Sequence, residues 1–463
     1  MDIEVNTDTE NTSYENINLS DNLNIAEIVE TDASGNETII DCTDSSSICP
    51  SIQKAFDKID EITDVSNYKI RKIRLLKDVY TVHKFTFGTN KKAILDFNNH
   101  NVKNYTSDTF IVNNGELEVT NSKNDESKPI NIKLNYRMFE NNASAKLTLK
   151  NISVNESNIS DYLIENYGTL STNNLSYKGK NKFLYNSGKV TITDSKLDNA
   201  NTYINNRAEY IINNRGEMEL NNSTAYSLFL VNNSSKFKMS GGDYDLSGSA
   251  SISHIINSGE MEITKANIDV DYNPLGVVAF KNSGTFKMND STLNVEGSQS
   301  IGGIFLENTN NATISNSTLK TGNIYTSYIT NDGTLNVINN TNINGHINNT
   351  NNLTVENSNI KTGRDHKAIS STGKTQSTII KWKSTVDNSV DVSCKHSPCA
   401  SGDLAPTVYA PVGTLILGEN DGDVSIEYPY IVSSKTFDTG DVYGVAVSED
   451  TIFNFYDGLI ESY

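Results

Sequence analysis

The stretch IINSGEMEI at residues 255–263 contains one copy of a unit that recurs through most of the chain. Its Asn-x-Gly tripeptide begins at Asn257, and successive copies are 18 to 28 residues apart between Asn166 and Asn349. A period of this length is typical of a solenoid built from stacked repeats. The tripeptide, or a variant with Ser or Asn in place of Gly, begins at Asn113, Asn166, Asn186, Asn214, Asn233, Asn257, Asn282, Asn308, Asn331 and Asn349, and a weaker copy begins at Ser371.

Apolar residues keep a fixed register with this asparagine. They stand two residues before it and then four, six and eleven residues after it, as Met261 and Ile263 do after Asn257. Residues two apart in a strand point to the same face of a sheet. The residue between them is polar, as Glu262 is. This alternation indicates strands that are buried on one side only.

Three such segments close one coil, and coils stack so that each strand pairs with its equivalents above and below. We therefore predict an all-β fold, a right-handed parallel β-helix. About a dozen coils at ~4.8 Å each would make a rod ~55 Å long. The Asn-x-Gly corner supplies residues that tolerate the left-handed backbone region. Equivalent asparagines are expected to stack into a ladder whose amides bond from coil to coil.

The units resemble the pectate-lyase-like right-handed β-helix superfamily, whose members carry an asparagine ladder at one turn. The resemblance covers residues 69–385. It implies that the ten asparagines named above are the ladder positions. The superfamily includes polysaccharide lyases, hydrolases, phage tailspikes and adhesins, so the resemblance implies a fold and selects no activity.

The two ends of the chain differ from the repeat region. Residues 1–45 are polar and acidic, and we predict a flexible leader. Residues 46–385 are predicted to form the capped β-helix, with an amphipathic helix from Ser51 to Asp64 as its N-terminal cap and Pro50 in the first turn. Residues 386–463 read as an irregular β segment, the start of a further surface repeat region.

The segment Phe453–Gly458, with the phrase FYDG, resembles repeats of large cell-surface proteins of Firmicutes. No secretory signal opens the chain at Met1-Asp2-Ile3-Glu4. Three explanations fit: a segment of a longer surface protein, a chain whose signal peptide has been removed, or a cytosolic protein. We favour the first two.

Composition narrows the classes of partner. The net charge is −19, which leaves no cationic footprint for nucleic acid. No apolar run approaches the ~20 residues of a membrane span. The four cysteines form two local pairs, Cys42 with Cys49 and Cys394 with Cys399, whose spacings permit small-loop disulfides in an oxidising compartment. Four unpaired thiols are the other reading of these spacings.

A search for chemistry gives weak candidates. The six histidines show no metal-ligand spacing, and Arg364-Asp365-His366 cannot converge on a strand because neighbouring residues face opposite sides. Asp269, Asp271 and Asp290 lie on neighbouring coils, where solvated surface is the simpler interpretation. The run from Glu419 to Asp423 lacks the ligand loop of an EF-hand. We predict no catalytic, cofactor or metal site.

The 22 tyrosines are numerous beside a single tryptophan, Trp382. Tyr177 and Tyr244 occupy predicted core positions, but exposed tyrosines on a flat sheet could stack on sugar rings.

Three functions remain open. The first is a non-catalytic adhesin-like or stalk segment of a bacterial surface protein, extracellular or secreted, whose partners are host or bacterial surface glycans or proteins. The second is a polysaccharide lyase or glycoside hydrolase on a β-helix scaffold. The third is a phage tailspike or fibre.

Overall fold

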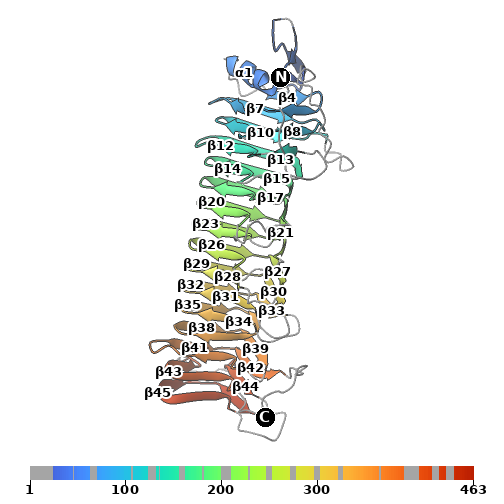
Figure 1. Ribbon diagram of the computed structural model, residues 1–463. Coiled ribbons are helices and arrows are strands. Elements are labelled where there is room, and N and C mark those ends of the chain that lie inside the picture. Colours follow the sequence, from blue (N-terminus) through green and yellow to red (C-terminus); the bar gives the residue numbers. More distant parts are fainter. Residues whose placement is uncertain are drawn as a thin grey trace, which may run out of the picture.

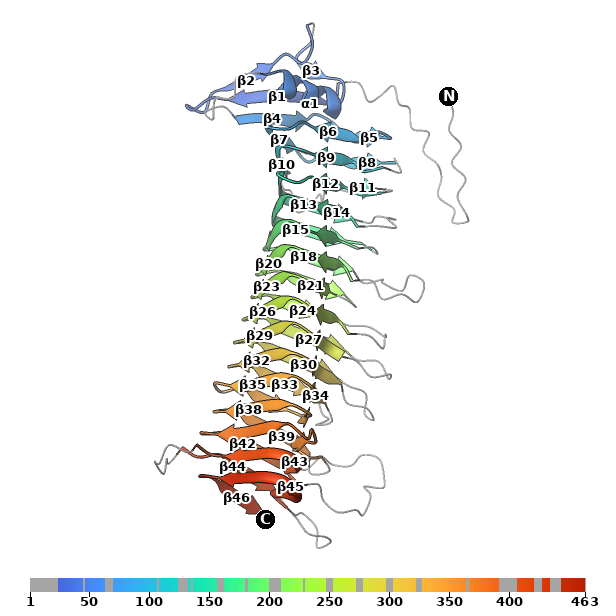
Figure 2. The ribbon, with the colours of Figure 1, turned by 90° about the vertical axis from the view of Figure 1, so that its left-hand side faces the viewer.

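The computed structural model is a long rod (Figures 1 and 2). Two predicted groups, Cys394 with Cys399 and Arg364 with Asp365, lie outside the residues that the structure describes. The described residues are 24–44, 46–62, 70–105, 108–123, 132–134, 136–155, 162–179, 182–199, 210–227, 230–246, 253–271, 278–296, 303–321, 327–363, 366–390, 406–419, 427–433 and 443–462.

Three columns of parallel strands run along the rod, and each coil contributes one strand to each column. The first column, which we call the ladder sheet, carries the Asn-x-Gly asparagines at its strand ends. Its strands are β6 (Phe85–Phe87), β9 (Ile111–Asn113), β12 (Phe139–Asn141), β14 (Ile164–Asn166), β16 (Leu184–Asn186), β19 (Ile212–Asn214), β22 (Val231–Asn233), β25 (Ile255–Asn257), β28 (Val278–Asn282), β31 (Ile304–Asn308), β34 (Tyr328–Asn331), β37 (His346–Asn349), β40 (Ile369–Ser371) and the first parts of β43 (Val408–Leu417) and β45 (Val445–Phe455).

The second sheet follows the Asn-x-Gly corner. Its strands are β4 (Ile70–Leu75), β7 (Lys92–Asp96), β10 (Glu116–Thr120), β13 (Lys146–Asn155), β15 (Thr169–Lys178), β17 (Lys189–Thr193), β20 (Glu217–Asn221), β23 (Lys236–Ser240), β26 (Glu260–Thr264), β29 (Thr285–Asn289), β32 (Asn311–Ser315), β35 (Thr334–Ile338), β38 (Asn352–Glu356), β41 (Ser377–Lys381) and the last parts of β43 and β45. This column of strands is about 70 Å long at ~4.8 Å per strand, so the rod exceeds the predicted dozen coils.

The third sheet completes each coil. Its strands are β5 (Val79–Thr81), β8 (Val102–Asn104), β11 (Ile132–Leu134), the last parts of β13 and β15, β18 (Lys196–Asn199), β21 (Thr224–Ser227), β24 (Asp243–Asp245), β27 (Asn267–Asp271), β30 (Thr292–Glu296), β33 (Thr318–Thr321), β36 (Asn342–Asn344), β39 (Asn359–Gly363), β42 (Thr385–Val390), β44 (Tyr430–Ser433) and β46 (Leu459–Ser462). The predicted all-β parallel β-helix is confirmed.

The inward side chains of the three sheets form one continuous apolar core along the rod. Tyr177 and Tyr244 lie in it, with 0% and 1% of their surfaces exposed, as predicted. The alternation that the sequence indicated is present in the second sheet: in β26, Met261 and Ile263 are buried, whereas Glu260 is exposed, and β23 and β29 repeat the pattern. Burial of such side chains stabilises each coil by about 1.5–3 kcal/mol per residue.

The glycine of the Asn-x-Gly corner does not adopt the predicted left-handed conformation, because it has no positive φ. Its role is close approach between coils. A Cβ atom on Gly259 would lie 2.1 Å from the carbonyl oxygen of Ser235 in the preceding coil. The backbone amide after the corner donates a hydrogen bond to a carbonyl of the preceding coil. This bond is 2.7 Å long for Glu260, which follows Gly259, and 3.2 Å long for Lys236, which follows Ser235. Glycine therefore lets neighbouring coils stack more tightly.

The left-handed residue lies at the next corner, eight positions after the ladder asparagine, between the second and third sheets. Its φ lies between 45° and 71° at every such position between Asn174 and Asn357. Asparagine and aspartate tolerate this conformation better than most residues. The residues are Asn174, Asp194, Asn222, Gly241, Lys265, Asp290, Asn316, Asn339 and Asn357.

The N-terminal end of the rod is closed by a helix and three short strands, β1 (Ala26–Thr31), β2 (Glu37–Ile40) and β3 (Ile48–Cys49). Strand β1 pairs antiparallel with β4, and it therefore covers the edge of the first coil. The prediction of a flexible leader over residues 1–45 is thus wrong for β1 and β2. The two strands pair with each other, β1 also pairs with β4, and their short antiparallel pattern carries no repeat signal.

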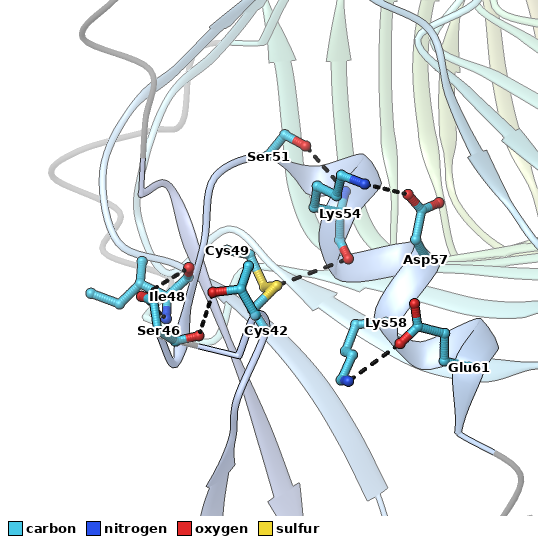
Figure 3. The surroundings of a disulfide bond; sticks show 10 residues. Cys42, Ser46, Ile48, Cys49, Ser51, Lys54, Asp57, Lys58 and Glu61 are labelled. Atoms are coloured by element: carbon cyan, nitrogen blue, oxygen red, sulfur yellow. Dashed lines mark hydrogen bonds and ion pairs between the residues drawn. A yellow bond between two sulfur atoms is a disulfide. The ribbon is translucent and has the colours of Figure 1, made fainter.

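Helix α1 (Ile52–Glu61) covers the open end of the core, as predicted, although Pro50 precedes the helix. The Ser51 hydroxyl caps it by accepting a bond from the Lys54 amide, 3.1 Å away. Phe56 is fully buried against Phe87, with ring centroids 5.1 Å apart. A disulfide joins Cys42 to Cys49 beside the helix, with their Cα atoms 5.2 Å apart (Figure 3).

The C-terminal region continues the same stack. Residues 386–463 were predicted to be an irregular segment outside the β-helix, and this boundary is wrong. Strand β43 pairs in parallel with both β40 and β41, and β45 pairs in parallel with β43. Shifts of register between Ala410 and Val412 and longer connections hide the repeat in the sequence.

Candidate functional site

The ten predicted ladder asparagines form the ladder, and the structure adds Asn141 to them. Each Nδ2 group donates to the Oδ1 atom of the next asparagine toward the C-terminus, at 2.7 to 2.8 Å. The last member, Asn349, donates instead to the Thr378 hydroxyl at 3.1 Å. All eleven side chains are at most 1% exposed. The ladder is therefore structural and is out of reach of a ligand.

The acidic candidates Asp269 and Asp290 do not converge. Asp269 lies on β27 of the third sheet, where its neighbours in adjacent coils are Asp245 and Asn294. Asp290 lies at the left-handed corner of the next coil and accepts a bond from Asn316. Within the described ranges, no three His, Cys, Asp or Glu side chains are grouped closely enough to hold a metal ion. Of the run from Glu419 to Asp423, the structure describes only Glu419, which pairs with Lys381 at 2.6 Å.

Two histidines stack with a tyrosine where the ladder sheet approaches the C-terminal end. The His346 ring lies 5.0 Å from the Tyr328 ring and 5.3 Å from the His366 ring, both in stacked geometry. Burial, together with the nearby His366, lowers the pKa of His346 from 6.5 to about 4. His346 is therefore neutral in the folded chain at pH 5 to 7.

This shift makes stability depend on pH. The unfolded chain protonates His346 near pH 6.5 and the folded chain only near pH 4, so stability is complete above about 6.5 and falls as the pH falls toward 4. We expect His346 to account for a loss of about 2–3 kcal/mol between pH 7.5 and 4.5. Urea unfolding at both pH values should show a smaller loss for His346→Phe, which keeps a stacking ring, than for wild type. The exposed-histidine control His83→Phe should match wild type, and equal losses for all three proteins would contradict the assignment.

Tyrosine and cationic side chains gather on the outer face of the ladder sheet, where β12, β14, β16 and β19 lie side by side. Positions equivalent by register bring them together, because residues four before, one before and one after the ladder asparagine form three columns along the sheet. We call this cluster the tyrosine platform, and its members are Tyr162, Tyr167, Tyr185, Arg137, Glu165, Lys182 and Arg215.

Tyr185 is the centre of the platform. Its ring centroid lies 5.7 Å from that of Tyr162 and 6.1 Å from that of Tyr167, and both pairs are tilted by 55°. Cations lie over two of the rings: Lys182 lies 5.1 Å from the centre of the Tyr162 ring, and Arg215 lies 5.7 Å from the centre of the Tyr185 ring. These distances are within the range of cation–π attraction.

Polar contacts hold the platform in place. Glu165 receives the guanidinium of Arg137 at 2.5 Å and accepts the hydroxyl of Tyr167 at 3.0 Å. Asn213 donates to the Tyr162 hydroxyl at 3.3 Å. Partial burial and the bond to Glu165 raise the pKa of Tyr167 to about 12, so this hydroxyl stays protonated and can donate. The Tyr167 side chain is nevertheless 41% exposed.

The arrangement places partly exposed aromatic rings beside hydrogen-bonding groups, a chemistry that suits a ligand with flat apolar faces and hydroxyl groups. Aromatic rings give a large apolar contact area with a polar tip, and arginine, lysine and glutamate beside them supply hydrogen-bond donors and acceptors. This cluster was not predicted from the sequence, because the prediction of exposed tyrosines did not assign them to particular coils. Aligning the coils on the ladder asparagine would have revealed the columns.

Comparison with known proteins finds no family model, curated protein or solved structure that matches this chain. In the part of the chain that the structure describes, no helix has the length and hydropathy needed to cross a bilayer.

Proposed function

We propose that this chain is a non-catalytic, carbohydrate-binding rod of a bacterial surface protein, extracellular or secreted, which binds glycans on the tyrosine platform. The observation that carries the proposal is the contact of Tyr185 with two further tyrosine rings, with Lys182 over the Tyr162 ring and Arg215 over the Tyr185 ring. A sugar ring presents axial C–H groups to an aromatic face and equatorial hydroxyls to the polar side chains around it.

Further observations support this proposal. The Cys42–Cys49 disulfide suits an oxidising compartment such as a cell surface. A solenoid offers one long outer face on which a glycan can contact several coils. The platform rests on four successive ladder-sheet strands, so rigid sheet rather than loop positions its rings.

Glycan-array binding with the full chain, with product analysis of every bound glycan, tests the proposal. We expect binding without turnover. Tyr185→Ala should then weaken the dissociation constant for the best glycan at least tenfold, ~1.4 kcal/mol, because it removes the ring that contacts both neighbours. Tyr185→Phe keeps the ring and should retain most of the affinity.

Tyr226 provides a matched control. Its side chain is exposed to the same 41% as that of Tyr167, but it lies on β21 of the third sheet. Tyr226→Ala should leave binding within twofold of wild type, whereas Tyr167→Ala should weaken it. Equal losses from both substitutions would remove the platform as the binding site, and cleavage of any bound glycan would overturn the non-catalytic reading.

A further inference from the structure

Charged side chains form rows across the outer face of the second sheet. In β20, β23 and β26, the first two outward positions carry the same charge within a strand and the opposite charge on the next strand. The register is direct: Glu217 and Glu219 pair with Lys236 and Lys238, which pair with Glu260 and Glu262. Strands β17 and β29 add one lysine each, Lys189 and Lys287. We call these eight side chains the charged rows.

The charged rows are open to solvent. Glu262 is partly exposed, and the other seven side chains are exposed. Among the described residues, no ion pair within 4.0 Å forms between any of the eight, although opposite charges lie on neighbouring strands. The rows line a hollow of about 550 Å³ on this face. Their charges are therefore available to an external partner.

The spacing of the rows restricts that partner. Opposite charges alternate at the strand spacing of ~4.8 Å, which is shorter than the screening length of about 8–10 Å in physiological salt. The field of such a pattern cancels within a few ångströms of the surface, so it attracts only a surface that repeats with the same period. The face of another parallel β-helix has this period, and a second copy of this chain carries both the period and the charges.

We propose that two copies of the chain associate through the charged rows, face to face and with the rods antiparallel. In this arrangement the lysine row of Lys236 and Lys238 in one copy lies opposite a glutamate row of the other. A two-fold axis relates the copies; it runs parallel to the strands and lies between the two rows. The association therefore stops at a dimer, and the contact between a lysine row and a glutamate row occurs twice, once from each copy. The hollow gives the opposing side chains room to enter.

The pattern of rows has two-fold symmetry about the normal to the sheet. The lysine row of one copy can therefore oppose either glutamate row of the other copy equally well. Half a turn about the normal to the sheet exchanges Lys189 with Lys287 and exchanges the row Glu217 and Glu219 with the row Glu260 and Glu262. With the two-fold axis on either side of the lysine row, the registers of these strands place six opposite-charge pairs across the interface. A parallel arrangement in register would instead oppose like charges and is disfavoured.

Sedimentation velocity of the full chain at about 100 µM tests this proposal. We expect a dimer at 100 mM NaCl and a monomer at 500 mM NaCl, because salt screens exposed charge pairs. K236E/K238E should raise the dimer dissociation constant at least 100-fold, and so should E217K/E219K/E260K/E262K. An equimolar mixture of these two variants should restore a dimer, since their rows are again opposite in charge.

Two controls make the outcome decisive. K196E/K320E changes the net charge by the same amount on exposed positions of the third sheet and should leave the dimer intact. K236Q/K238Q removes the charges without creating repulsion within the molecule and should also give a monomer. A monomeric wild type at 100 mM NaCl, or a dimer unaffected by K236E/K238E, would overturn the proposal. Glycan binding by the platform should be the same in every variant, so the two proposals fail independently.

Discussion

Asn233→Ala is expected to lower the free energy of unfolding by about 3–5 kcal/mol. The Asn233 amide donates to Asn257 Oδ1 at 2.7 Å and to the Glu260 carbonyl at 2.9 Å, and its own oxygen accepts from Asn214 at 2.8 Å. The three asparagine side chains are buried, and each buried group left without its partner costs about 1–3 kcal/mol. The missing amide also leaves a small cavity. Thermal and urea unfolding, followed by circular dichroism, would measure the change.

The position of Asn233 in the middle of the ladder gives this substitution a second signature. Because each coil of a solenoid contacts only its neighbours, a weak coil can divide the rod into two units that unfold separately. Hydrogen exchange should therefore increase first in β22 and β25. The control is Asn232→Ala on the same strand, whose side chain points outward and should cost less than about 0.5 kcal/mol. A similar loss from both substitutions would mean that the ladder adds no specific stability.

Phe56→Ala is expected to cost about 3–5 kcal/mol, as truncation of a fully buried aromatic residue usually does. Phe56 is the contact between α1 and Phe87 in the first coils. Gln53 strengthens the same junction by bonding the backbone of Thr86 in both directions, at 2.7 and 3.1 Å. Loss of the phenyl ring loosens the cap and exposes the end of the core.

The effect of Phe56→Ala should be local at first, and it should be followed by association. Amide exchange is expected to rise in α1, β6 and β9 while strands beyond β20 keep wild-type protection. An uncovered coil end offers unpaired edge and apolar surface, so aggregation on mild heating should also increase. Lys54→Ala on the exposed side of α1 is the matched control, since that side chain is 64% exposed. Uniform exchange along the rod would contradict a capping role.

The fold was readable from the sequence because one set of spacings serves the whole rod. Ile263 and its equivalents stand at the same distance from the ladder asparagine in every coil, so all of them were predicted to face inward. The regular repeat of this unit then predicted that the coils stack in parallel. The reason given for the glycine was wrong, since residues such as Gly259 permit close coil contact rather than a left-handed turn. Asn141 was missed because two extra residues separate it from its strand in the second sheet, β13.

The structure of the two ends and the clusters on the outer surface were harder to predict from the sequence. Pairing of β1 with β4 joins residues about 45 positions apart through antiparallel strands that occur once, so no periodicity reveals it. The tyrosine platform and the charged rows lie at outward positions, where the core places no constraint on residue type. Only the register between whole coils brings Tyr162 beside Tyr185, or Glu219 beside Lys238. The prediction used only the inward, apolar positions of the repeat, so it did not align these outward residues.

The parallel stacking has a mechanical consequence. Hydrogen bonds between coils lie along the rod, so tension applied to its two ends pulls each layer of bonds directly apart, one coil after another, and does not shear many layers at once. Every coil that detaches between Asn113 and Asn349 releases 18 to 28 residues. That length of chain extends to about 60–100 Å in place of the ~4.8 Å that the coil occupied. Under tension, the rod would therefore lengthen one coil at a time and dissipate mechanical energy at each step.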